Sequence, residues 1–110
     1  MPSRDDSYVL DILNAARWIM EFVEGLDEGA FLNDMKTQSA VIRQLEVIGE
    51  ATKRLSAEAR AAQPDVPWRS IAGMRDILIH AYDHVDIQQV WQVTQQDIPE
   101  LIAKLEPLIN

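Results

Sequence analysis

Apolar residues recur at three- to four-residue intervals along most of this 110-residue sequence, the spacing that places them on one face of an α-helix. Ser3, with Asp6 three residues later, predicts an N-cap and an acidic first turn, and the first helix should end near Gly25. A second series of apolar residues with this spacing predicts a helix over about residues 35–60, and Gly49 would allow close helix packing. We call each such series an apolar stripe. The first stripe is Tyr8, Ile12, Ala15, Ile19, Phe22, Val23 and Leu26, and the second is Val41, Leu45, Ile48, Thr52, Leu55 and Ala59.

Prolines divide the remaining sequence into further helices. Between the first two stripes, GLDEGAFLND is a connection with room for one short helical turn. Pro64 and Pro67 prevent the second helix from continuing, and Pro67 suits the first turn of a third helix that starts near Trp68. Pro99 predicts a kink or split in the last helix, with Asp97 as a new cap.

The last helix has its own start signal and stripe. Asp86 is a predicted N-cap, and Gln89, three residues later, fits the second position of a capping box. The stripe that follows is Ile87, Val90, Trp91, Thr94, Ile98, Leu101, Leu105 and Leu108. Strand alternation, internal repeats and low-complexity segments are all absent from the sequence. It therefore predicts one all-α domain over residues 1–110, an up-and-down helical bundle.

Composition excludes several classes of protein. With no cysteine, the chain has neither disulfides nor thiolate metal ligands, which fits a reducing compartment. No stretch approaches the ~20 apolar residues of a membrane span, and MPSRDDSYVL lacks the apolar region of a secretory signal. We therefore expect a soluble, cytoplasmic protein with no membrane partner.

Charge is distributed unevenly along the chain. The net charge of −8 argues against indiscriminate nucleic-acid binding, because phosphates are repelled at long range. Residues 35–82, however, hold seven basic and five acidic residues and are locally positive. If any part of the chain meets a phosphate, we expect it to be this middle third.

Arg75 lies in the stretch RDILIHAY, among apolar residues. On a helical wheel of ~100° per residue, its neighbours within about 60° are Trp68, Ile71, Ala72, Leu78, Ile79 and Tyr82. A buried guanidinium keeps its proton and needs a carboxylate, a water-filled cleft or an anionic ligand such as phosphate. Both a structural ion pair and a functional role remain open from spacing alone.

Histidine placement adds a geometric constraint. His80 and His84 have the i, i+4 spacing of paired metal ligands, but no clear third ligand accompanies them, so no metal site is predicted. Arg75 and His80 are five residues apart, about 140° around an ideal helix. A symmetric homodimer could bring the two residues from different protomers into one cleft.

The pattern R-x-x-x-x-H-x-Y, formed by Arg75, His80 and Tyr82, resembles the signature of the HEPN superfamily. It most resembles the HepT-like toxins that pair with a minimal nucleotidyltransferase antitoxin. The segments IRQLEVIGEATKRLS, PDVPWRSIAGMRDILIHAY, VD and VW…DIPEL are also similar to that family's pattern. The resemblance extends from the first helix to Leu101.

This resemblance implies an all-α homodimer with its active cleft at the subunit interface, acting as a metal-independent ribonuclease without a cofactor. Arg75 would bind the scissile phosphate of the RNA substrate, and His80 would carry out acid–base chemistry. Asp76 fits the polar position after the arginine. Tyr82 matches the tyrosine that the antitoxin adenylylates. Because RNA supplies its own 2′-hydroxyl nucleophile, the predicted products are a 2′,3′-cyclic phosphate and a 5′-hydroxyl.

Two other functions stay open. The chain could instead be a non-catalytic, substrate- or nucleotide-binding subunit of a two-component nucleotidyltransferase, or a structural helical dimer in which Arg75 is ion-paired. Trp18, Trp68 and Trp91 lie within or beside apolar stripes, which favours packing over base stacking. Lys36 and Arg43 share one face of the second helix, for which a solvated surface is the default and an RNA or partner path the alternative.

Overall fold

The computed structural model describes residues 3–73 and 86–109, and every element within these ranges is helical, which confirms the all-α prediction. Residues 68–73 are also helical. The elements are α1 (Arg4–Val23), α2 (Glu28–Leu32), α3 (Met35–Arg54), α4 (Ala57–Ala62), α6 (Ile87–Gln92), the π-helical turn η1 (Val93–Asp97) and α7 (Ile98–Ile109). Within these residues, no helix is both long enough and apolar enough to span a membrane.

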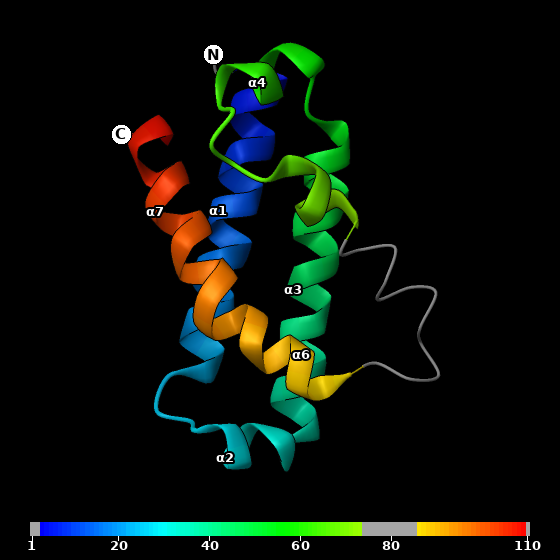
Figure 1. The fold of residues 1–110 in the computed structure, drawn as a ribbon, viewed down its shortest axis with the longest axis vertical. Helices are drawn as coiled ribbons and strands as arrows, with labels where there is room; N and C mark the ends of the chain where they lie inside the picture. Colours follow the sequence, from blue (N-terminus) through cyan, green and yellow to red (C-terminus); the bar gives the residue numbers. More distant parts are fainter. Residues whose placement is uncertain (1–2, 74–85, 110) are drawn as a thin grey trace.

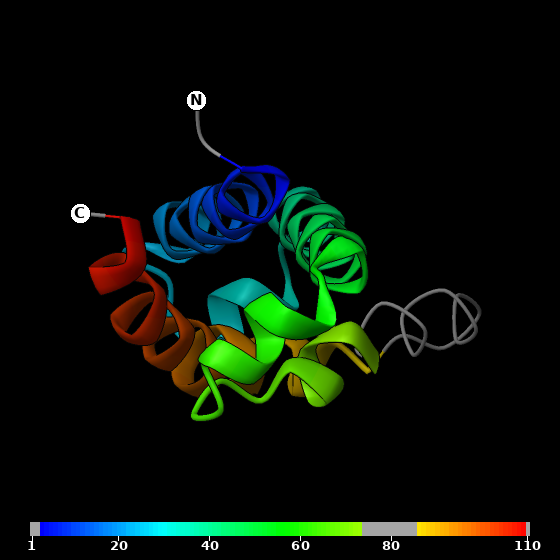
Figure 2. The same ribbon diagram turned by 90° about the horizontal axis from the view of Figure 1, so that it is seen from above.

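The long elements of the described bundle are α1, α3 and the continuous run of α6, η1 and α7, which we call the third rod (Figure 1). α1 runs down the molecule, α3 returns antiparallel to it, and the third rod climbs across both. Seen from above, α1 and α3 lie side by side in one layer, while the third rod, α4 and residues 68–73 form the other (Figure 2). α1 packs against both α3 and α7, so the core lies between the two layers.

The predicted stripes form this core. Ile12, Ile19, Val41, Leu45 and Leu105 are at most 1% exposed, each at a position that the helical spacing predicted. Gly49 is also buried in α3, as expected of a glycine at a helix contact. At the start of α1, Ser3 and Asp6 form a complete capping box, which confirms the predicted helix start.

The predicted second helix is wrong beyond Arg54, because the chain breaks at Leu55 and restarts as α4. Ser56 caps α4 by accepting a hydrogen bond from the Ala59 N–H at 3.0 Å. The carboxylate of Asp5, at the start of α1, accepts hydrogen bonds from the Ser56 N–H at 2.9 Å and the Ser56 hydroxyl at 2.7 Å. This contact between distant residues stabilises a break that the apolar spacing does not predict.

Pro99 divides the last helix where the sequence predicts it, but Asp97 is not a cap. Instead, the backbone widens into η1, and the Ile98 N–H donates to the carbonyl of Val93, five residues back. Pro99 has no N–H to donate, and its ring would clash with a carbonyl in a regular α-helical turn. The wider turn relieves this conflict without ending the rod.

The short helix α2 closes one end of the bundle. Phe31 is fully buried, and its ring centroid lies 5.2 Å from that of Trp91. The Gln38 side chain donates to the carbonyls of Phe31 at 2.9 Å and Leu32 at 3.1 Å, which satisfies the end of α2. α2 thereby connects α1 to α3 while covering the start of the third rod.

Candidate functional site

The residues predicted to carry the chemistry lie outside the described ranges. Arg75, Asp76, His80 and Tyr82 all fall within residues 74–85, as does His84. Their predicted roles stay predictions. What the structure describes are the two flanks of this segment, residues 67–73 before it and α6 after it, which end at the same edge of the bundle in both views (Figures 1 and 2).

The first flank is anchored by Trp68. Helix formation begins directly after Pro67, whose carbonyl accepts a hydrogen bond from the Ile71 N–H at 3.1 Å, as predicted. The Trp68 side chain is only 7% exposed, and its indole N–H lies 3.1 Å from the carbonyl of Arg60 and 3.0 Å from that of Gln63. One buried ring therefore fixes the end of α4 against the start of residues 68–73.

The second flank begins with the predicted cap. The Asp86 carboxylate accepts a hydrogen bond from the Gln89 backbone N–H at 3.2 Å and starts α6. One turn further on, Val90 is buried in the core. Both flanks are thus fixed to the bundle. The helix start near Trp68 and the cap at Asp86 were predicted from the sequence, whereas the contacts of the Trp68 indole with Arg60 and Gln63 were not.

A basic groove of about 540 Å³ lies beside the first flank. We use this name for the surface lined by Lys53, Ala57, Arg60, Trp68, Arg69, Ala72 and Gly73. α3, α4 and residues 68–73 each supply one of its three cations, and no described acidic residue lines it. Its lining includes Gly73, which is two positions before Arg75 in the sequence.

Sequence reasoning did not find this cluster. It identified residues 35–82 as the part of the chain suited to meet a phosphate. Lys53 and Arg60, seven residues apart, would share one face of the predicted second helix, but Arg69 lies beyond the end of that helix. Only the break at Ser56 and the turn around Pro67 bring the three cations together. The local excess of basic residues was the available signal.

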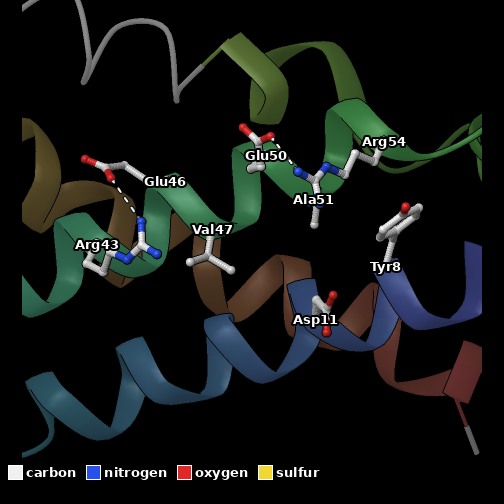
Figure 3. Close-up of a pocket in the computed structure, with 8 residues that line it drawn as sticks. All are labelled: Tyr8, Asp11, Arg43, Glu46, Val47, Glu50, Ala51 and Arg54. Atoms are coloured by element: carbon white, nitrogen blue, oxygen red, sulfur yellow. Dashed lines mark hydrogen bonds and ion pairs between the residues drawn. The ribbon is translucent and has the colours of Figure 1, made fainter. Parts of the chain in front are cut away.

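A second groove, of about 390 Å³, lies on the outer face of α1 and α3 (Figure 3). Its cations are compensated: Arg43 lies 3.6 Å from the carboxylate of Glu46, and Arg54 lies 3.2 Å from that of Glu50. We call it the paired groove; its lining is Tyr8, Asp11, Arg43, Glu46, Val47, Glu50, Ala51 and Arg54. The pairing of Arg43 fits the solvated helix face taken as the default for that residue.

Among residues 3–73 and 86–109, two carboxyl groups have a lowered pKa, and both have structural partners. Hydrogen bonds from the backbone N–H and the hydroxyl of Ser56 lower the pKa of Asp5. Hydrogen bonds from the hydroxyl and the backbone N–H of Thr37 lower the pKa of Asp34, which caps α3. These shifts are explained by a helix contact and a helix cap rather than by a reactive site.

The three tryptophans differ in exposure. Trp68 is buried, and Trp91 packs against Phe31, as predicted for stripe residues. Trp18, however, is 51% exposed and stacks on Phe22 at a centroid distance of 5.7 Å. Packing within the chain therefore accounts fully for Trp68 but only partly for Trp18.

Comparison with known proteins settles the family. The model of the family described as "Ribonuclease HepT-like" matches residues 12–108, a range that spans both flanks and the R-x-x-x-x-H-x-Y motif. The chain belongs to the ribonuclease HepT-like family. This membership confirms the resemblance to the HepT-like proteins and supports a ribonuclease activity.

Relatives within the ribonuclease HepT-like family match nearly the whole chain. "Probable ribonuclease HepT" of Thermococcus cleftensis is 46% identical over 101 residues, 92% of each chain. A protein of Methanocaldococcus jannaschii, provisionally named an RNase, is 41% identical over 111 residues, covering 100% of this chain and 96% of its own. One of Caldanaerobacter subterraneus with a similar provisional name is 38% identical over 103 residues, 94% of this chain and 92% of its own. No solved structure gives a significant match.

Proposed function

We propose that this chain is a metal-independent endoribonuclease, the toxin of a toxin–antitoxin pair whose second member is a minimal nucleotidyltransferase. The observation that carries the proposal is the family match over residues 12–108, which includes the motif residues Arg75, His80 and Tyr82. The names of the relatives, which designate ribonucleases, support the same activity.

The proposed chemistry needs no external nucleophile. The 2′-hydroxyl oxygen of RNA bonds to the adjacent phosphorus, and the bond from phosphorus to the 5′-oxygen breaks. A base takes the proton from the 2′-hydroxyl, and an acid delivers one to the departing 5′-oxygen. His80 serves this proton transfer because its ordinary pKa lies near neutrality, and Arg75 neutralises the charge that develops on the phosphate.

A homodimer is part of the proposal. Arg75 and His80 are about 140° apart on an ideal helix, so two such residues of one chain would not face the same phosphate. A two-fold interface presents the same surface twice, and Arg75 of one protomer would then act with His80 of its partner. Cross-complementation between Arg75→Ala and His80→Ala chains tests this, because mixed dimers would recover one intact cleft.

Tyr82 is the proposed point of control. Transfer of AMP from ATP to its hydroxyl, with release of pyrophosphate, would place an anion and an adenine beside Arg75 and exclude RNA. Incubation with the cognate nucleotidyltransferase and ATP should add one AMP group to the chain and abolish cleavage. Tyr82→Phe should stay unmodified and active, while Tyr8→Phe, a change at the chain's other tyrosine, should be modified like the wild type.

The decisive experiment is cleavage of RNA in the presence of a chelator, after intact mass confirms an unmodified Tyr82. We expect the wild type to leave 2′,3′-cyclic phosphate ends and His80→Ala to be slower by at least about 100-fold. His84→Ala, four residues away, is the matched control and should remain active.

A different result would favour the second candidate function. If the folded, unmodified dimer cleaves no RNA but binds the nucleotidyltransferase and nucleotides, the chain is a non-catalytic subunit of a two-component nucleotidyltransferase. The net charge of −8, unfavourable for a general RNA binder, is the observation behind this alternative. Loss of cleavage on adding the chelator would instead contradict the metal-independent mechanism.

A further inference from the structure

The chain has to hold a polyanion although its net charge is −8. At long range this charge repels phosphates, so binding requires a local group of cations close to the reactive residues. Three arginines in the described ranges do not provide one, because carboxylates neutralise them. Arg17 pairs with Glu106 at 3.4 Å, and Arg43 and Arg54 pair with acids of their own helix.

Two arginines of the basic groove differ in this respect. Within residues 3–73 and 86–109, neither Arg60 nor Arg69 forms an ion pair with a carboxylate. Both line the groove together with Lys53, and no described acid joins them there. Two arginine guanidiniums that can each make bidentate hydrogen bonds thus lie on one surface and are available to phosphate oxygens.

Contacts away from the cations hold the groove in shape. The Trp68 indole bridges the carbonyls of Arg60 and Gln63, and Asp5 holds Ser56 at the start of α4. These contacts fix α4 against both α1 and residues 68–73, so that the backbones carrying Arg60 and Arg69 are positioned before any ligand binds. Such preorganisation reduces the entropy cost of binding.

The lining between the cations consists of small residues. Ala57, Ala72 and Gly73 occupy the surface, and a Cβ built on Gly73 would meet no atom within 4 Å. A sugar–phosphate backbone can therefore approach closely. The aromatic residue of the lining, Trp68, is buried and uses its N–H internally, so it offers no base-stacking surface. The lining suits contacts with phosphates rather than with bases.

We infer that the basic groove carries the backbone of single-stranded RNA to the motif residues, with Lys53, Arg60 and Arg69 binding phosphates next to the scissile one. The inference rests on the proposed ribonuclease function and extends it to the substrate path. It requires that the groove contribute affinity that depends on salt and depends little on sequence.

The test compares RNA binding by the His80→Ala dimer with and without the triple change Lys53→Gln, Arg60→Gln and Arg69→Gln. Anisotropy of labelled single-stranded RNA is measured over a range of KCl concentrations. We expect a loss of affinity of at least about tenfold at low salt, and a slope of log K against log salt reduced by roughly 2, since each lost contact removes ~0.7. In the His80-intact protein, the triple change should raise KM and leave kcat unchanged.

Two matched variants separate location from charge. Arg17→Gln, Lys36→Gln and Arg43→Gln together make the same change in net charge outside the groove, and should retain the slope within about 0.5. Arg60→Lys with Arg69→Lys keeps the groove's charge and should also retain most of the salt slope. Circular dichroism checks that every variant is folded.

The outcomes distinguish this inference from the proposed function. If the wild type cleaves RNA and the groove variant keeps its KM and slope, or if both triple variants lose affinity equally, the groove is not the RNA path. Selective loss of nucleotidyltransferase binding with RNA binding intact would assign the groove to that partner and overturn the inference. If the groove variant loses RNA affinity but the wild type cleaves nothing, the groove stands and the ribonuclease function fails.

Discussion

The two grooves contain the same kinds of charged side chain but arrange them differently. In the paired groove, acids on α3 lie one helical turn from the arginines and neutralise them, as Figure 3 shows for Arg43 and Arg54. In the basic groove, three cations come from three different segments, and none of the described lining residues is acidic. The spacing of residues along one helix creates the first arrangement. The break at Ser56 and the turn around Pro67 create the second.

This difference indicates which arginines are available to a ligand: within the described residues Arg60 and Arg69 form no ion pair with a carboxylate, whereas Arg43 and Arg54 do. An exposed i, i+3 or i, i+4 ion pair contributes little to stability, yet it reduces the charge that a phosphate would meet. Counting basic residues in a sequence therefore overestimates the binding surface. What matters is whether an acid lies within reach of each cation in the folded chain.

The largest expected effect concerns Trp68, on which the basic groove depends and the paired groove does not. Trp68→Ala should lower the free energy of unfolding by about 3–5 kcal/mol, because it opens a cavity and removes the bridge to α4. Trp68→Phe keeps most of the ring and should cost about 0.5–1.5 kcal/mol for the lost indole hydrogen bond. The cost stays small because the carbonyls of Arg60 and Gln63 each still accept a backbone N–H at 3.2 Å, from Gln63 and Val66 respectively. Urea unfolding followed by circular dichroism measures both.

The control for this prediction is Trp18→Ala. Trp18 is 51% exposed, and its loss should cost about 1 kcal/mol or less, mainly the stacking on Phe22. A cost for Trp68→Ala no larger than that of Trp18→Ala would contradict the anchoring role of Trp68.

A smaller effect is expected at Asp5, which holds the start of α4. The pKa of Asp5 lies below its ordinary value of 3.8, because the Ser56 backbone N–H and hydroxyl donate to the carboxylate. A lowered pKa in the folded state means that this contact stabilises the fold above pH ~3.8 and that the stabilisation is lost as the pH falls through the folded-state value. Asp5→Asn should therefore destabilise the chain at neutral pH and approach the wild type in acid.

Thermal unfolding between neutral and acidic pH measures this difference. Asp11→Asn, the same change elsewhere on α1, provides the comparison. A gap between Asp5→Asn and the wild type that widens in acid would show that the carboxylate of Asp5 does not stabilise the fold through Ser56.

The smallest effect is expected from Glu46→Gln, which releases Arg43 and makes the paired groove more like the basic one. Stability should change by no more than about 0.5 kcal/mol, as is usual for an exposed pair. RNA binding should become slightly tighter, with the salt slope increased by no more than ~0.7. Cleavage should not become faster than in Glu28→Gln, which makes the same charge change on α2. Faster cleavage by Glu46→Gln would show that any free cation on the surface serves the site.

Much of the fold was predictable because it depends on neighbours in sequence. Apolar spacing predicted the core positions of α1 and α3. The residue pattern at the helix starts predicted the caps at Ser3 and Asp86, because a cap is a hydrogen bond between residues three apart. The candidate site residues were also named from sequence. Arg75 stood out because a charge at the centre of an apolar helix face is visible without a fold, and the family resemblance supplied the roles of Asp76, His80 and Tyr82. Arg75, Asp76, His80 and Tyr82 lie outside the described residues, so their geometry stays a prediction.

The sequence by itself therefore determined the helices, their buried faces and the family, because each is encoded in local spacing or in continuous motifs. The second helix breaks where a local cap and a distant contact coincide: Ser56 caps α4 at Ala59, and Asp5, 51 residues away, holds Ser56 in place. The distant contact is decided by the tertiary structure. The tertiary structure alone also decided which cations meet: Lys53, Arg60 and Arg69 share a groove because α4 and residues 68–73 pack together around Trp68. Helical periodicity describes one segment at a time and contains no information about which residues of different segments lie together.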